Sequence, residues 1–301
     1  MERDNPWNAF PDLVVDKQRP VRPDVCVLGG ANWRMLDRYP LVLPNIPVIN
    51  LVQHVKHADS ELRLQKFLRR KAIRICVSDQ VANELRATEM TVGPLVVIPN
   101  GIDLACLPER RDGEWTVDVL IAGLKEPELA AQVAARLARE GRRIDVLAEQ
   151  IPRPDFLGRI QEARVTIFLP HTTEGFYLPA LEGMALGTIV VCPDCIGNRS
   201  YCLPGYNAFR PNYTIDDVVR DVEAALALPI DLARQLLENA RQTAAEHSLE
   251  RERLTFLDVL HNIDELWGGM DDITEPSQVV YDASSRSKRA GGRARPIAGT
   301  H

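Results

Sequence analysis

Two glutamates, Glu174 and Glu182, lie in the part of the chain whose residue types are best suited to binding a ligand. An apolar run ending at Leu169 predicts a buried strand, and Pro179 suits the first turn of a following helix. The free N–H groups and positive end of such a helix favour an anion such as a diphosphate. Glu174 falls in the loop before this helix, and Glu182 lies one turn into it, where its carboxylate can accept hydrogen bonds from hydroxyl groups beside the anion.

Two further polar residues follow apolar runs that predict strands. Lys125 comes after the run 117–122 and the loop glycine Gly123, where it is either a cation for a diphosphate or a solvated loop lysine. His54 follows the run 46–52, at the carboxyl end of a predicted strand. This position is equally compatible with ligand contact and with ordinary packing. His57 is a lesser candidate in the same loop.

The elements that must position these side chains alternate between short apolar runs and amphipathic stretches. This order predicts an α/β fold with parallel sheets covered by helices on both faces. It occurs twice, so we expect two Rossmann-like domains that face each other across a cleft. The predicted strands are 24–28, 46–52, 72–77 and 95–99 in the first series and 117–122, 143–147, 165–169 and 188–191 in the second. The predicted helices are 60–71, 78–85, 128–140, 156–163, 179–186, 215–228, 232–247 and 250–267.

Composition shifts between these runs predict the domain bounds. We expect a shortened N-terminal domain over 1–107, a polar linker over 108–116 and a nucleotide-binding domain over 117–249. A helix within 250–272 can cross back to the first domain. A basic tail over 273–301 is expected to be disordered. This tail is either simply solvated or an electrostatic handle for DNA or an acidic membrane surface.

The bulk composition is that of a globular protein with two cores. The chain has 301 residues, of which 45% are hydrophobic and 26% charged. The net charge of -6 argues against a globally basic nucleic-acid coat. No signal-peptide pattern and no apolar run long enough to span a bilayer are visible, so a cytoplasmic location is expected.

Three of the six cysteines, Cys192, Cys195 and Cys202, form a C-x2-C-x6-C pattern. A zinc site would need a fourth ligand with its own spacing, and no second pair matches. Buried free thiols are therefore favoured over a metal.

The segment around the two glutamates resembles the E-x7-E motif of retaining glycosyltransferases of family 4, the group-1 type. That pattern runs approximately E-G-F-x-L-x-x-L-E-A-M-A-x-G-x-P-V-V. The matching positions are Glu174, Gly175, Phe176, Leu178, Leu181, Glu182, Met184, Ala185, Gly187, Val190 and Val191. The chain departs from it at Gly183, usually alanine, and at Ile189, often proline. The resemblance implies the GT-B fold, and it is good over 118–209 and thin before Pro47.

The resemblance also implies roles for individual residues. Glu174 would bind hydroxyls of the donor sugar, and Glu182 the ribose of the nucleotide. Lys125 would meet the leaving diphosphate, although Leu124 replaces the arginine common in the family. His54 would reach the donor sugar from the first domain. Further donor-side candidates are the segment Gly175, Phe176, Tyr177 and Leu178, the loop glycine Gly123, and Asn198 and Arg199 in the loop after the last strand. The acceptor-side candidates are Gly29, Gly30 and His57.

The function that follows is transfer of a sugar from a nucleotide-diphosphate sugar to an acceptor hydroxyl on a glycan, lipid or small molecule. Retention of anomeric configuration is implied by the family. The sequence has no D-x-D motif, so neither an obligatory metal nor another cofactor is expected. Two alternatives stay open: a phage-type enzyme that glycosylates a hydroxymethylated DNA base, and a non-catalytic subunit that binds sugar nucleotides.

Overall fold

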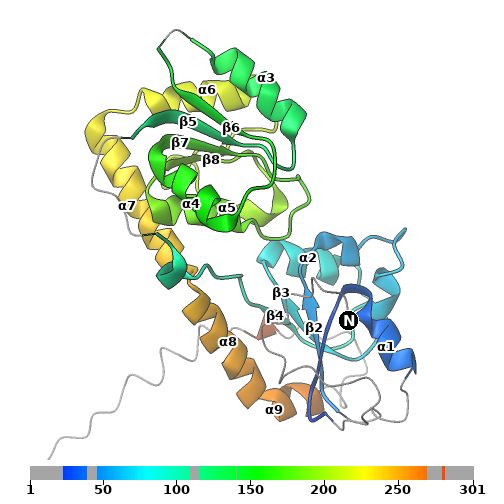
Figure 1. Cartoon of the computed structure of the whole chain (residues 1–301). Coiled ribbons are helices and arrows are strands. Elements are labelled where there is room, and N and C mark those ends of the chain that lie inside the picture. The colour runs from blue at the N-terminus through cyan, green and yellow to red at the C-terminus, as the bar shows by residue number, and fades with distance from the viewer. Residues whose placement is uncertain (1–22, 39–45, 109–114, 140, 270–279, 282–301) are drawn as a thin grey trace, which may run out of the picture.

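The chain folds around two parallel β-sheets that lie one above the other in Figure 1. The computed structural model describes residues 23–38, 46–108, 115–139, 141–269 and 280–281. The first sheet has the strand order β1-β2-β3-β4-β9, with β1 Cys26–Gly29, β2 Val48–Val52, β3 Ile73–Cys76, β4 Leu95–Val97 and β9 Val280–Tyr281. The second sheet has the order β6-β5-β7-β8, with β5 Val117–Ala122, β6 Ile144–Leu147, β7 Ala163–Phe168 and β8 Ile189–Val191. The predicted α/β class with parallel sheets is confirmed.

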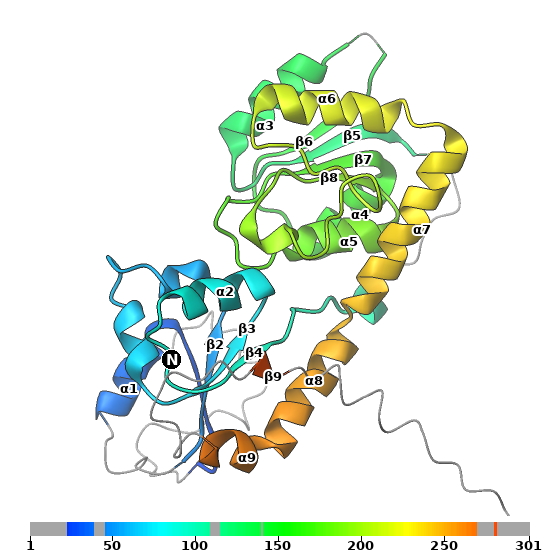
Figure 2. The ribbon, with the colours of Figure 1, turned by 180° about the vertical axis from the view of Figure 1, so that it is seen from behind.

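Helices cover both faces of the second sheet because its strands are apolar on both sides. Along β5, Val119 and Ile121 pack with α3 (Pro127–Leu137) and α6 (Ile215–Leu226), whereas Leu120 and Ala122 belong to the cluster that contains α4 (Arg153–Glu162) and α5 (Leu178–Leu186). Figures 1 and 2 show these two helical layers on opposite faces of the sheet. The strand order also creates a topological switch point at β5, since the chain moves from β5 to β6 on one side and returns to β7 on the other. Ligands bind outside the carboxyl ends of the strands at such points.

The chain crosses between the two sheets twice, and both crossings touch. The long helix α7 (Ile230–Glu246) descends from the second sheet and is followed by α8 (Leu249–His261) and α9 (Ile263–Gly268) beside the first sheet (Figure 2). Val259 and Leu266 join the buried cluster of the first sheet with Ile73 and Val96. The segment after β4 meets the α7–α8 junction, where the amide of Ile102 donates to the carbonyl of His247 over 2.9 Å.

A buried arginine shapes the connection between β2 and β3. The guanidinium of Arg74 donates to the carbonyls of Phe67, Leu68 and Arg70 over 3.1, 2.7 and 2.7 Å. These bonds fix the path of residues 67–70. The helix predicted over 60–71 is wrong: the structure has turns and a short 3-10 helix, Gln65–Arg69.

The structure also differs from the sequence expectations near the C-terminal end. The helix predicted over 250–267 is two helices, with the break between α8 and α9 at Asn262, whose side-chain amide donates to the Asp258 carbonyl over 2.7 Å. Most of the predicted linker (109–114) and of the predicted basic tail lies outside the described residues, apart from β9. The domain bounds stay a prediction. No helix in the described part of the chain is long and apolar enough to cross a membrane.

Candidate active site at the carboxyl edge of the second sheet

Two turns face each other at the switch point between β5 and β7. The turn after β5 closes with a hydrogen bond from the amide of Glu126 to the carbonyl of Gly123, 3.0 Å long. The turn after β7 closes in the same way, from the amide of Glu174 to the carbonyl of His171 over 3.1 Å. Because β5 and β7 are neighbours in a parallel sheet, their following turns lie side by side. This brings the predicted residues Lys125 and Glu174 together.

Lys125 and Glu174 form an ion pair in which the ammonium donates to Oε1 of the carboxylate. The side chains are 40% and 20% exposed, so the pair stays open to solvent. The ammonium also lies 5.5 Å from the centre of the Tyr177 ring, a cation–π distance. The turn requires glycine at position 123, because a Cβ there would lie only 2.3 Å from the Cβ of Ala130 on α3.

The first domain contributes His54 to the same place. His54 and Glu174 form an isolated antiparallel bridge, and Ser78 donates from Oγ to the carbonyl of Gly175 over 3.0 Å. A Cβ on Gly175 would lie 2.0 Å from the carbonyl oxygen of Gln53, so only glycine allows this approach. The site is thus assembled where the end of β2 meets the β7–α5 loop.

The imidazole of His54 is held in one orientation by its own backbone. Nδ1 accepts a hydrogen bond from the amide of Lys56 over 3.1 Å, which leaves the proton of the neutral ring on Nε2. Burial lowers the pKa of His54, and the positive charges of Lys56 and Lys125 lower it further, against a rise caused by Glu174. His54 is therefore a neutral hydrogen-bond donor at pH 7.

The start of α5 has the uncapped amides that an anion site requires. Tyr177 stands at the N-cap position without a side-chain cap, and Pro179 follows in the first turn. The aromatic residues of the motif point into the protein: the Phe176 ring centre lies 5.3 Å from that of Tyr201, and both Phe176 and Tyr177 are buried. Leu178, the first residue of α5, is half-buried against the same core. Phe176 and Tyr177, predicted as donor contacts, can therefore contact a ligand only through their backbone atoms.

Glu182 lies one turn into α5 and is almost completely buried, with 3% of its surface exposed. Its Oε1 is 2.6 Å from the guanidinium of Arg153, the first residue of α4. Burial of a carboxylate is tolerated here because a cation neutralises it. The side chain of its partner Arg153 is 57% exposed.

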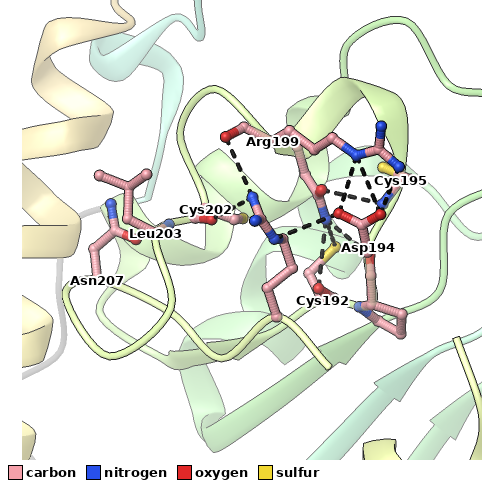
Figure 3. Close-up of polar contacts among 10 residues, drawn as sticks. Cys192, Asp194, Cys195, Arg199, Cys202, Leu203 and Asn207 are labelled. Atoms are coloured by element: carbon pink, nitrogen blue, oxygen red, sulfur yellow. Dashed lines mark hydrogen bonds and ion pairs between the residues drawn. The ribbon is translucent and has the colours of Figure 1, made fainter. Parts of the chain in front are cut away.

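The loop after β8 is held together by hydrogen bonds and ion pairs among its own residues (Figure 3). Asn198 is fully buried, and its amide donates to the carbonyl of Pro193 over 2.8 Å and accepts from the amide of Cys195 over 3.2 Å. These bonds occupy the side chain, so we correct the predicted donor contact of Asn198 to a structural role. Arg199 is half-exposed and pairs with Asp194 over 2.6 Å, as Figure 3 shows. It stays a candidate for ligand contact.

The three cysteines of this region are buried free thiols. Burial raises the pKa of Cys192 and of Cys195, the latter to about 12, so both stay protonated. Among the described residues no group of three or more His, Cys, Asp or Glu side chains is arranged to hold a metal ion.

The predicted acceptor-side residues lie at the edge of the first sheet. Gly29 ends β1 and Gly30, with φ of 50°, begins the next turn; a Cβ on either would meet no heavy atom within 4 Å. Both positions therefore have room for a side chain among the described residues. His57 is 5% exposed, and burial followed by the charges of His54 and Arg74 lowers its pKa to about 4. We correct its predicted acceptor role to packing as a neutral side chain.

Comparison with protein families gives a match for the part of the chain that carries this site. Residues 116–243 match the family described as "Glycosyl transferases group 1". Most of the second domain is therefore similar to this family. The match covers both turns, the start of α5 and the loop after β8. A sequence comparison with curated proteins gives no significant match.

Solved structures share the GT-B arrangement of this chain over most of its length. Sucrose-phosphate synthase from Thermosynechococcus elongatus is 16% identical, with 80% of this chain and 74% of that chain covered and a TM-score of 0.63. Anabaena Alr3699/HepE in complex with UDP-glucose is 12% identical, with 79% of each chain covered and a TM-score of 0.64. An α,α-trehalose-phosphate synthase (UDP-forming) from Burkholderia vietnamiensis is 15% identical, with 78% and 72% covered and a TM-score of 0.61. At these identities the likeness concerns the fold, which confirms the predicted GT-B architecture.

Three ionisable residues of the candidate site were missed by sequence reasoning: Glu126, Arg153 and His171. Arg153 pairs with Glu182, Glu126 follows Lys125 in the chain, and His171 contacts Glu126. His171 begins the motif-bearing loop and Arg153 begins a helix, which are the only signals the sequence offers. Their pairing depends on which strands are neighbours in the sheet.

Proposed function

We propose that this protein is a retaining, metal-independent glycosyltransferase that moves a sugar from a nucleotide-diphosphate sugar to an acceptor hydroxyl. The observation that carries the proposal is the Lys125–Glu174 pair beside the uncapped start of α5, with the buried carboxylate of Glu182 one turn further along. A cation, a helix N-terminus and two carboxylates in this order suit a diphosphate flanked by two sets of hydroxyls.

In this proposal each part of the donor has its own partner. The diphosphate lies between Lys125 and the start of α5, the sugar hydroxyls bind Glu174, and the ribose hydroxyls bind Glu182. His54 donates from Nε2 to the sugar from the opposite domain. HepE, a structural neighbour, was solved with UDP-glucose, which supports a donor of this class.

The chemical step breaks the bond between the anomeric carbon and the diphosphate oxygen, and the electron pair of that bond goes to the diphosphate. Lys125 and the helix amides stabilise the charge that develops on this leaving group. The acceptor oxygen bonds to the anomeric carbon on the face that the diphosphate leaves, and its proton passes to a diphosphate oxygen. Glu174 and Glu182 position the donor and take no part as a glycosidase acid and base.

A donor panel tests the proposal. The melting temperature of the full chain is measured with uridine, guanosine and thymidine diphosphate sugars, one of which should raise it by mass action. Glu182→Ala should abolish the shift, whereas Glu174→Ala should lower turnover more than nucleotide binding. Glu238→Ala, on the exposed surface of α7, is the control.

Product analysis completes the test. Proton NMR of the product formed with a simple alcohol acceptor reports whether the anomeric configuration is kept. Inversion would refute retention. A shift with a sugar nucleotide but no release of nucleotide diphosphate would favour a non-catalytic subunit, and no shift with any of the sugars would refute the donor site.

A further inference from the structure

The two turns of the site are joined by two side-chain contacts that run in parallel. Besides the pair between Lys125 and Glu174, the adjacent residue Glu126 places Oε1 3.1 Å from Nδ1 of His171. An ionised carboxylate can only accept a hydrogen bond, so His171 donates from Nδ1. Lys125 and Glu126, the last two residues of the turn after β5, thus contact Glu174 and His171, the two ends of the turn after β7.

The side chain of Glu126 makes no bond to its own helix, although Glu126 is the N-cap residue of α3. Its carboxylate reaches across to the β7 turn instead. Tyr213 lies in the same cluster: its hydroxyl donates to the carbonyl of Pro170, and the charge of Glu126, after burial, raises its pKa.

We propose that Glu126 and His171 are a positioning pair for the diphosphate site, an inference that rests on the function proposed above. Glu126 is a carboxylate adjacent in sequence to the cation that would bind the diphosphate. Left without a partner, it would compete for Lys125 and repel the anionic ligand. His171 draws the carboxylate away and keeps Lys125 available.

The inference predicts that loss of His171 is harmful only while Glu126 keeps its charge. His171→Ala should weaken binding of a nucleoside diphosphate about fivefold, on the scale of a partly exposed charge pair. Glu126→Gln in the same chain should restore affinity to within about twofold of the original, because it removes the freed carboxylate. A scaffold role for the pair would give the opposite result, since the second change would then deepen the loss.

The test is calorimetric titration with UDP and with GDP, at low and at high salt. It compares the original chain with His171→Ala, with the double variant His171→Ala/Glu126→Gln and with Glu238→Gln. The melting temperature of each chain checks that it folds. The weakening by His171→Ala should shrink at high salt because the freed carboxylate of Glu126 is partly exposed and its repulsion of the ligand is screened. Glu238→Gln, which removes a carboxylate from an ion pair on α7, is the matched control and should leave affinity unchanged.

Three outcomes overturn the inference: unchanged affinity in His171→Ala, failure of Glu126→Gln to restore it, or an equal loss in Glu238→Gln. Each leaves the donor site standing if the original chain binds a diphosphate. Absence of binding by the original chain to UDP, GDP and their sugars overturns the proposed function and this inference with it.

Discussion

Ionisable side chains in this protein are held by specific partners, and the environment of each sets its charge. Glu182 pairs with Arg153 in the interior, whereas His57 has no anionic partner among the groups that shift its pKa and stays neutral. The motif gave both glutamates from the sequence. It could not give Arg153, His171 or the burial of His57, because these depend on contacts between segments far apart in the chain.

His57 makes the stability of the fold sensitive to acid. Its pKa is about 4 in the folded protein, lowered by burial and by the charges of His54 and Arg74, against about 6.5 in an unfolded chain. As the pH falls below 6.5 the unfolded chain takes up a proton that the folded chain refuses, so the free energy of unfolding decreases. By pH 5 the loss from this residue should be about 2 kcal/mol.

Urea denaturation at pH 7 and pH 5 checks this prediction. His57→Asn should be less sensitive to the change of pH than the original chain by about that amount. His261→Asn, on α8, serves as the control for histidine removal in general. Equal sensitivity of the original chain and His57→Asn would show that His57 titrates normally.

Elements of the second domain follow the sequence closely, and those of the first follow it less well. The strand predicted over 117–122 and the helix predicted over 179–186 differ from the structure by at most one residue at an end. They are local features of strong apolar pattern and turn chemistry. The helix predicted over 60–71 is wrong, and Arg74, a residue outside the segment, binds the carbonyls of residues 67, 68 and 70, where that helix would have ended.

The loop between β7 and α5 joins the two domains at a position where only glycine fits. In Gly175→Ala the new Cβ would lie 2.0 Å from the backbone carbonyl of Gln53, so this loop and His54 must move apart. Turnover should fall about a hundredfold, since displacement of a positioning group by about 1 Å has effects of that size. Nucleotide affinity should change much less because Glu182 and α5 are untouched.

Steady-state kinetics and nucleotide titration of the variant give the two quantities. Gly158→Ala is the control, since it lies within α4 and its Cβ would meet no heavy atom within 4 Å. That change should leave turnover intact and raise stability by about 0.5–1 kcal/mol. If Gly175→Ala turns over as fast as Gly158→Ala, the contact has no part in catalysis.

At the scale of the whole molecule, the two crossings between the sheets touch at Gly101. Its amide donates to Oε2 of Glu252 over 2.7 Å, and a Cβ at this position would lie 2.4 Å from the carbonyl oxygen of Ser248. Repetition of the strand–helix series predicts two domains, but nothing in the sequence of 98–103 alone shows that residues near 248 lie against it. That contact depends on the path of α7.

Gly101→Ala should loosen the junction of the two crossings. The added methyl group forces two backbones apart, and overpacking of this kind lowers the free energy of unfolding by about 1–3 kcal/mol. Urea denaturation measures the change, with Gly268→Ala on α9, where a Cβ has open space, as the control. Equal stability of the two variants would mean that the crossings separate without cost.

The return of α8 and α9 to the first sheet has a consequence for synthesis on the ribosome. The β1–β4 part of that sheet is made early, but its buried face stays uncovered until Val259 and Leu266 emerge. The cluster between the second sheet, α3 and α6 draws only on residues made before α8. Although domains generally fold in the order of their translation, here we expect the domain made second to be completed first, while the domain made first waits for its last two helices.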